Sequence, residues 1–198
     1  MDSLASAVAE VEAQSPFVNA VIANAGLLGH VTTLPSVSGK ESIDEVYDQL
    51  WNLERSDSMA VVDMNLVSVY YSLIAFLRLL DAGNTQASSP GKLDHIQSQF
   101  LIISSEAAIT RRPGPNYLYA SSKAGLLHLT KNLSTGFAPY GIRANCIVPG
   151  LFITEMTNAW FDETTRSPGS MPKEIFPATR SGSPEVSLAT KGIRVFGS

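Results

Sequence analysis

The stretch YLYASSKAGLLHLTKNLSTGFAPYGIRANCIVPG, residues 117–150, decides how this chain folds. From Tyr117 to Phe137, apolar residues recur at the three- and four-residue spacing that predicts a helix. From Gly141 to Val148, a short and mostly apolar run predicts a buried strand, which Pro149-Gly150 ends. A long helix joined by a short turn to a buried strand is one unit of an α/β fold.

The same alternation of helices and strands runs through the rest of the chain, without internal repeats. Apolar runs predict two further strands, over residues 17–23 and 100–103. Helical periodicity predicts three further helices, over residues 3–14, 41–53 and 59–80. We expect Asp81-Ala-Gly-Asn84 to cap the last of these helices, because glycine suits a helix C-terminus.

Three strands separated by helices of this length require crossover connections, which make the strands parallel within one sheet. Parallel sheets are covered by helices on both faces, and ligands bind at the carboxyl ends of their strands. Here those ends carry Asn24-Ala-Gly26, Ser104-Ser105 and Val148-Pro-Gly150. We therefore predict an α/β protein with its site along this edge.

Composition excludes several classes of protein. The 198 residues, 44% of them hydrophobic, suffice for the core of a single domain. A net charge of -4 argues against nucleic acid as a partner, because binders of nucleic acid need a surplus of Lys and Arg. The lone Cys146 excludes a disulfide framework and a multi-cysteine metal site, so no metal is predicted, and it fits a reducing compartment.

Residues 60–80 form a mostly apolar stretch of 21 residues, which is long enough to cross a bilayer. Asp63, Asn65 and Arg78 interrupt this stretch, and ionisable groups are costly inside a membrane. We therefore predict a buried amphipathic helix and no membrane partner. Residues 1–16 lack the basic start and apolar run of a signal peptide, so we expect the protein to be cytoplasmic.

Tyr119 and Lys123 stand four residues apart in the predicted helix, which places the phenol and the ammonium on one face. A nearby cation favours the phenolate, so this pair suits acid and base chemistry. The spacing alone also fits a solvated helix face. The preceding strand ends in Ser104-Ser105, however, and a serine hydroxyl there is able to hold a substrate oxygen for the tyrosine.

Five motifs follow one another in a fixed order. They are Asn24-Ala-Gly26, Asp63-Met-Asn65, Leu101-Ile-Ile-Ser-Ser105, Tyr119-Ala-Ser-Ser-Lys123 and Ile142-Arg-Ala-Asn-Cys-Ile-Val-Pro-Gly150. In this order they resemble the short-chain dehydrogenase/reductases, in the single-domain branch. The stretches 76–83 and 177–182 further resemble fungal members related to 3-oxoacyl-carrier-protein reductases. The resemblance implies a partial Rossmann-like, doubly wound parallel sheet.

The resemblance also implies a set of site residues. Tyr119 would be the acid or base, and Lys123 would lower its pKa and bind the nicotinamide ribose. Ser105 would orient and polarise a substrate carbonyl, and Asn65 would hold a water that links Lys123 to solvent. Besides Tyr119 and Lys123, the residues expected to bind the cofactor, NADP or NAD, are Asn24, Gly26, Pro149, Gly150, Phe152 and Thr154.

Alternatives stay open for several of these residues. Ser105 precedes Tyr119 by 14 residues, one more than the usual spacing in the family, so we infer a one-residue insertion near Arg111-Arg112 and keep Ser104 as second candidate. Asn65 also fits a buried polar residue that bonds to the backbone. His128 would suit a Ser-His hydrolase, but the chain has no G-x-S-x-G motif. We expect Cys146, among Ile and Val, to be core packing.

The chain lacks the glycine-rich turn that holds the pyrophosphate of a dinucleotide, because none of its 14 glycines are two positions apart. In the family this turn would lie about 60 to 80 residues before Asn24. The end of the chain lacks the family's final glycine pair as well. We therefore expect a chain truncated at both ends, with residues 1–185 as an incomplete NAD(P)-binding domain that lacks the first βαβ units and the last strand, and 186–198 as a divergent tail.

Two functions are consistent with these residues. The first is hydride transfer between NAD(P)H and a small carbonyl or alcohol substrate. The second is a catalytically silent chain that pairs with relatives, because cofactor binding is in doubt without the glycine turn. The apolar breadth of helices 59–80 and 117–137 suggests that they form the interface of a homodimer or tetramer, as the family resemblance also implies.

Overall fold

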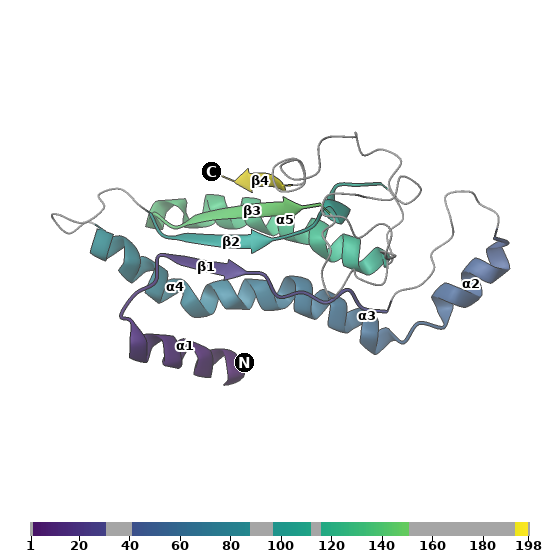
Figure 1. The fold of residues 1–198 in the computed structure, drawn as a ribbon, viewed down its shortest axis with the longest axis horizontal. Coiled ribbons are helices and arrows are strands. Elements are labelled where there is room, and N and C mark those ends of the chain that lie inside the picture. Colours follow the sequence, from purple (N-terminus) through teal and green to yellow (C-terminus); the bar gives the residue numbers. More distant parts are fainter. Residues whose placement is uncertain (1, 31–40, 88–96, 112–115, 151–192, 198) are drawn as a thin grey trace, which may run out of the picture.

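The computed structural model describes residues 2–30, 41–87, 97–111, 116–150 and 193–197 (Figure 1). Helices and strands alternate through most of these residues, as predicted. The helices are α1 (Asp2–Gln14), α2 (Ile43–Trp51), α3 (Arg55–Val62), the π-helical turn η1 (Asp63–Val67), α4 (Ser68–Ala87), the 3-10 turn η2 (Glu106–Ala108), α5 (Tyr117–Phe137) and the 3-10 turn η3 (Ala138–Tyr140). The strands are β1 (Ala20–Ala23), β2 (Gln99–Ile103), β3 (Arg143–Pro149) and β4 (Ile193–Gly197).

The strands form one sheet in the order β1-β2-β3-β4, in which the first three are parallel. Ala23 pairs with Ile102 and Ile103 with Ile147, so the carboxyl ends of β1, β2 and β3 share one edge. This confirms the α/β class and the partial Rossmann-like sheet. Strand β4 was not predicted: it runs antiparallel beside β3, within the segment expected to be a divergent tail.

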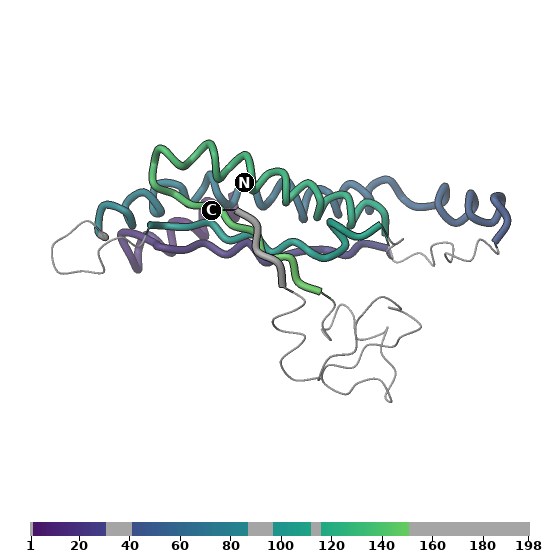
Figure 2. Tube along the Cα trace, turned by 90° about the horizontal axis from the view of Figure 1, so that it is seen from above, coloured from purple at the N-terminus to yellow at the C-terminus, as the bar shows by residue number. Residues whose placement is uncertain are grey.

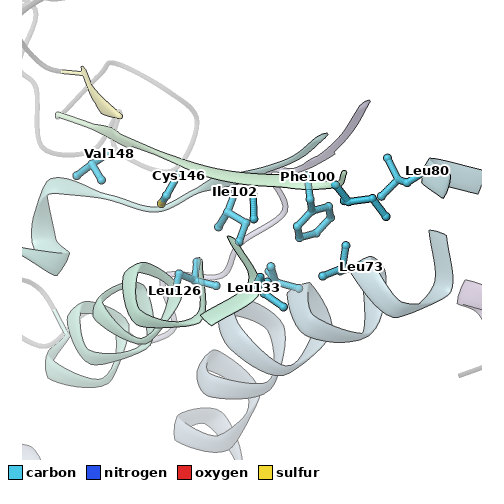
Figure 3. Close-up of a cluster of buried hydrophobic side chains, with 11 residues drawn as sticks. Leu73, Leu80, Phe100, Ile102, Leu126, Leu133, Cys146 and Val148 are labelled. Atoms are coloured by element: carbon cyan, nitrogen blue, oxygen red, sulfur yellow. The ribbon is translucent and has the colours of Figure 1, made fainter. Parts of the chain in front are cut away.

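The core lies between the sheet and two helices, α4 and α5 (Figure 3). Alternate residues of β2 and β3 point toward these helices, as the two-residue period of a strand requires. The buried strand residues are Phe100, Ile102, Ala144, Cys146 and Val148, and the helices contribute Val69, Leu73, Leu80, Leu126 and Leu133. Cys146 is fully buried in this cluster, which confirms that it is core packing.

Helices α4 and α5 lie on the same face of the sheet (Figure 2). Val21 and Ala23 of β1 pack against the core on this face. Ile22, between them in the strand, points to the opposite face and is 61% exposed. Among the described residues, α4 and α5 therefore cover one face of the sheet, and Ile22 lies open on the other.

The helix predicted over 59–80 is longer than expected, because α3, η1 and α4 run on from one to the next and α4 continues to Ala87. The predicted cap at residues 81–84 is therefore wrong. Gly83 lies inside α4, where a Cβ atom would come within 2.4 Å of the Val18 carbonyl oxygen and 2.6 Å of Ser98 Oγ. This glycine allows close approach to the chain before β1 and does not end the helix.

Residues Arg55–Gln86 are, by length and composition, apolar enough to cross a membrane. One stripe of this long helix faces inward, where Val61, Leu73 and Leu80 are fully buried. Its opposite side is partly open, since several large apolar residues are between 38% and 55% exposed: Met59, Met64, Val67, Tyr70, Tyr71 and Ile74. The helix is thus amphipathic as predicted, but buried along one side only.

Candidate active site

Asn65 lies in the π turn η1 and is fully buried. Its Oδ1 accepts a hydrogen bond from the Leu27 N–H at 2.7 Å, and its Nδ2 donates to the Leu27 carbonyl at 2.8 Å. Nδ2 also donates to Ser122 Oγ at 3.1 Å. The side chain thus bonds to the backbone, as the alternative interpretation expected, and it ties the loop after β1 to the helix that carries Tyr119 and Lys123.

The two serines at the end of β2 differ in what they contact. Ser104 is buried, and its Oγ donates to the Lys123 carbonyl at 2.8 Å. Ser105 caps η2, its Oγ accepting from the Ala107 N–H at 3.2 Å, and its side chain also influences the pKa of Tyr119. The structure therefore brings Ser105 to the tyrosine, whereas Ser104 fixes the backbone beside Lys123.

Helix α5 positions Tyr119 and Lys123 one turn apart. Asn116 begins this helix, and its Oδ1 accepts hydrogen bonds from the N–H groups of Leu118 and Tyr119. The Lys123 side chain is buried, and its Nζ donates to the Ile103 carbonyl at 3.1 Å, 5.8 Å from the centre of the Tyr119 ring. The ammonium therefore lies between the end of β2 and the phenol.

Burial dominates the titration of both groups. It raises the pKa of Tyr119 above its ordinary value, and the side chain of Ser105 opposes this shift. It lowers the pKa of Lys123, an effect that the nearby Cys146 opposes. Burial is thus the largest influence on the pKa of Tyr119, and it acts in the direction opposite to the lowering expected from Lys123. That lowering by Lys123 stays a prediction.

The other predicted residues fall into two groups. Asn24 and Gly26 follow β1, and Pro149 and Gly150 end β3, so all four lie at the same sheet edge as Ser105. Gly26 comes close to both functional side chains, since a Cβ atom on it would lie 3.2 Å from Asn65 Oδ1 and 3.3 Å from Lys123 Nζ. Phe152 and Thr154 lie outside the described residues.

Sequence reasoning missed two residues that hold the site together. Asn116 Nδ2 donates to the carbonyls of Leu28 and His30, which joins the loop after β1 to the start of α5. Its position directly before the helix is an N-cap signal that was readable. Ser122 accepts from Asn65 and donates to the Tyr119 carbonyl at 2.7 Å, and no sequence signal distinguishes it from Ser121.

Comparison with known families identifies this arrangement. Residues 1–165 match the family described as short chain dehydrogenase. The chain belongs to the short-chain dehydrogenase/reductase family. Membership sets aside the hydrolase alternative built on His128, and it makes oxidoreductase chemistry the activity of the family to which this chain belongs.

Two fungal members of the family are similar over most of this chain. Short-chain dehydrogenase/reductase SAT3 of Stachybotrys chartarum is 37% identical over 92% of the chain, which spans 70% of that protein. Short-chain dehydrogenase/reductase PhomF of Diaporthe leptostromiformis is 34% identical over 90% of the chain, which spans 59% of that protein. The fungal resemblance seen in the sequence is thus confirmed at the level of the family.

A solved structure agrees in fold. The RhlG/NADP active-site complex of Pseudomonas aeruginosa matches 94% of this chain with a TM-score of 0.65 at 22% identity, and the chain spans 62% of that protein. At this identity the likeness shows the short-chain dehydrogenase/reductase fold alone. That protein binds NADP.

The side chains present fit one end of a dinucleotide. Lys123 Nζ donates to the Ile103 carbonyl, and an ammonium carries three N–H donors, so it has the capacity to bond a ligand as well. Together with the Tyr119 and Ser105 hydroxyls, these donors suit the oxygen atoms of a ribose and of a carbonyl. The sequence contains no Gly-x-Gly, so the residues present do not include the usual cradle for the pyrophosphate.

Among the described residues, no group of three or more His, Cys, Asp or Glu side chains is placed to hold a metal ion.

Proposed function

We propose that this chain is an NAD(P)-dependent oxidoreductase that interconverts a small carbonyl compound and its alcohol, with Tyr119 as the acid and base. One observation carries the proposal: the buried Lys123 ammonium lies 5.8 Å from the centre of the Tyr119 ring. Ser105 supports it, because this serine lowers the pKa of the same phenol and so belongs to its surroundings. This group stands at the carboxyl end of β2, where parallel sheets bind their ligands.

In the direction of reduction, the Tyr119 hydroxyl gives its proton to the carbonyl oxygen of the substrate. The Ser105 hydroxyl donates a hydrogen bond to the same oxygen and so stabilises the charge that develops there. Lys123 stabilises the phenolate that Tyr119 becomes, because its ammonium is close and buried. When bound, the nicotinamide supplies the hydride. Because the pKa of Tyr119 is raised, the hydroxyl keeps its proton at neutral pH, which favours reduction.

The same residues would hold the cofactor. Tyr119 and Lys123 would bind the nicotinamide ribose through the donors that remain on them. Asn24 and Gly26, at the end of β1, would border the ribose on the adenine side. The residues that would wall the nicotinamide are Pro149, Gly150, Phe152 and Thr154. Either NADP or NAD is consistent with these residues.

Calorimetry with NADPH and NADH, followed by turnover with a panel of ketones and 3-oxoacyl thioesters, tests the proposal. We expect Tyr119→Phe to lower kcat at least about 100-fold, since it removes the proton donor. The matched control is Tyr117→Phe, because Tyr117 is 48% exposed on the same helix and should leave kcat unchanged. Absence of cofactor binding, or equal loss in both variants, overturns the proposal and leaves the catalytically silent chain as the function to pursue.

We further propose that the exposed side of α4, together with α5, pairs with a second copy of the chain. The open apolar residues of η1 and α4 support this, since contiguous apolar surface of this kind marks interaction sites. Ile74→Glu, which places a charge on this side, should shift the chain from dimer or tetramer to monomer in light scattering. Ile43→Glu on α2 is the control, because Ile43 is exposed on a different helix. A monomeric unmodified chain contradicts the proposal.

We propose a cytoplasmic, reducing location, which suits a buried free thiol at Cys146. No nucleic-acid or membrane partner is part of the proposal, in keeping with the net charge of -4 and the inward-facing stripe of the long helix. Small carbonyl or alcohol compounds are the partners that it requires.

A further inference from the structure

Gly26 lies next to two side chains of the candidate active site, those of Asn65 and Lys123. It follows β1, and a Cβ atom at this position would lie 3.2 Å from Asn65 Oδ1, 3.3 Å from Lys123 Nζ and 3.9 Å from Lys123 Cε. The first two distances are tighter than most Cβ contacts in proteins. A side chain as small as that of alanine therefore fits only if one of these two groups moves.

Backbone conformation does not explain why this residue is glycine. Among the described residues, the glycines with positive φ are Gly29 and Gly141, so Gly26 has a conformation that alanine also adopts. Where the conformation permits it, alanine in place of glycine stabilises a protein by restricting the unfolded chain. What opposes alanine at position 26 is thus contact with Asn65 and Lys123.

Of these two neighbours, Lys123 is the one that would move. Asn65 Oδ1 accepts a hydrogen bond at 2.7 Å from the N–H of Leu27, the residue next to Gly26, so oxygen and loop are fixed together. Asn65 Nδ2 is fixed as well, by the Leu27 carbonyl and Ser122. Lys123 Nζ, in contrast, lies at the end of a flexible four-carbon side chain. Its hydrogen bond to a described residue is the one to the Ile103 carbonyl.

We propose that Gly26 is a positioning residue, whose missing side chain sets the place of the Lys123 ammonium between the Ile103 carbonyl and the Tyr119 ring. This role rests on the proposed oxidoreductase function and deepens it. A methyl group at position 26 pushes Nζ away from Gly26 and covers part of the ammonium, which weakens its interaction with the Tyr119 phenolate. The lysine must give by only a few tenths of an ångström. A displacement of about 1 Å can lower a rate by about 100-fold, so this smaller shift should have a smaller effect.

The test is a comparison of Gly26→Ala with Gly136→Ala. Gly136 is a matched control, because no atom lies within 4 Å of the position that its Cβ would take. Lysine labelled with carbon-13 at Cε allows the Lys123 amine to be titrated by NMR without a bound cofactor, and the signal missing from Lys123→Met assigns it. Among the described residues, the titratable groups that face Lys123 are Tyr119 on its own helix and Cys146 on β3.

We expect Gly26→Ala to shift the Lys123 titration midpoint downward, because the added methyl group excludes water from the ammonium. Its kcat should fall about tenfold, with a melting temperature within about 2 °C of the unsubstituted chain. Gly136→Ala should leave the midpoint and kcat unchanged. An unchanged midpoint in Gly26→Ala overturns the inference, whatever its activity.

Two further outcomes are decided by the same design. If the unsubstituted chain turns over no substrate, the proposed function fails, whereas the titration still shows whether Gly26 places Lys123. If Gly26→Ala does not fold, the double variant Gly26→Ala/Lys123→Ala decides, because shortening the lysine removes the Nζ contact. Recovery of the fold supports the inference, and failure to recover it contradicts it.

Discussion

Asn65 binds both backbone groups of Leu27: its Oδ1 accepts from the N–H at 2.7 Å and its Nδ2 donates to the carbonyl at 2.8 Å. The backbone of the loop after β1 thus forms two hydrogen bonds with a side chain, in the pattern that it would form with the backbone of a neighbouring strand. Asn65 is fully buried, whereas Leu27, on the other side of these hydrogen bonds, is 40% exposed. The side-chain amide of Asn65, which belongs to the helical turn η1, therefore replaces the backbone partner that a strand would supply.

Asn65→Ala should destabilise the protein by about 1–2 kcal/mol, because it removes two part-buried hydrogen bonds with Leu27 and the buried one with Ser122. Chemical denaturation monitored by circular dichroism measures this change. Asn52→Ala is the control, since Asn52 is exposed and donates one hydrogen bond, to the Asp48 carbonyl. It should change the free energy of unfolding by less than about 0.5 kcal/mol. Equal effects in the two variants would contradict the structural role given to Asn65.

Gly83→Ala should destabilise the protein by about 1–3 kcal/mol, because its Cβ would press on the Val18 carbonyl and on Ser98 Oγ. Gly136→Ala, in open space on α5, should instead stabilise the protein by about 1 kcal/mol. Urea denaturation gives the free energy of unfolding of both variants. Gly83→Ala reports the effect of the close contacts, and Gly136→Ala reports the effect of helix propensity alone. A Gly83→Ala variant as stable as the unsubstituted chain would contradict the close contacts described for Gly83.

Lys123→Met should be more stable than the unsubstituted chain at neutral pH, because burial lowers the pKa of Lys123. The unfolded chain then binds more protons than the folded one between the lowered pKa and the ordinary value of 10.5, so stability rises with pH across that window. The advantage of Lys123→Met should therefore shrink as the pH approaches about 10.5. Lys131→Met, exposed on α5, should show no such trend in urea denaturation at several pH values.

The raised pKa of Tyr119 predicts different pH profiles for the two directions of the proposed reaction. Reduction needs the protonated phenol, so its rate should be constant from about pH 6 to about pH 9. Oxidation needs the phenolate, so its rate should rise about tenfold per pH unit over the same range. Initial rates in both directions check this. An oxidation rate that levels off near neutral pH would mean that the pKa of Tyr119 is lowered when the enzyme works.

Local patterns predicted the parts of the fold that local physics determines. The helix predicted over about 117–137 matches α5, since its apolar spacing is regular. The parallel strands followed from their apolar runs and the crossover rule. The run from Ile193 to Gly197 contains three apolar residues without regular alternation, so it carries too weak a signal by itself, and its pairing with β3 is decided by a distant segment.

Predictions failed where contacts between distant residues decide. Gly83 has the sequence context of a helix cap, yet Val18 and Ser98 explain its lack of a side chain. The ordered motifs located Ser105, Tyr119 and Lys123, but the direction in which the pKa of Tyr119 moves depends on burial, which no spacing encodes. Their functional roles stay predictions until the variants are measured.

The π turn at Asp63–Val67 brings the buried residues of α3 and α4 to the same side of the long helix. Eight residues of regular α-helix turn through about 800°, which would leave Val69 about 80° away from Val61 around the axis. Both residues are nonetheless buried against the body of the protein. The wider π turn absorbs this difference, so that α3 and α4 present one continuous inner side. Loss of a single residue there would leave Val61 and Val69 only about 20° from alignment in a regular α-helix, whereas insertion of a further residue would rotate one half of the helix against the other by about 100° and would turn one of the two buried stripes outward.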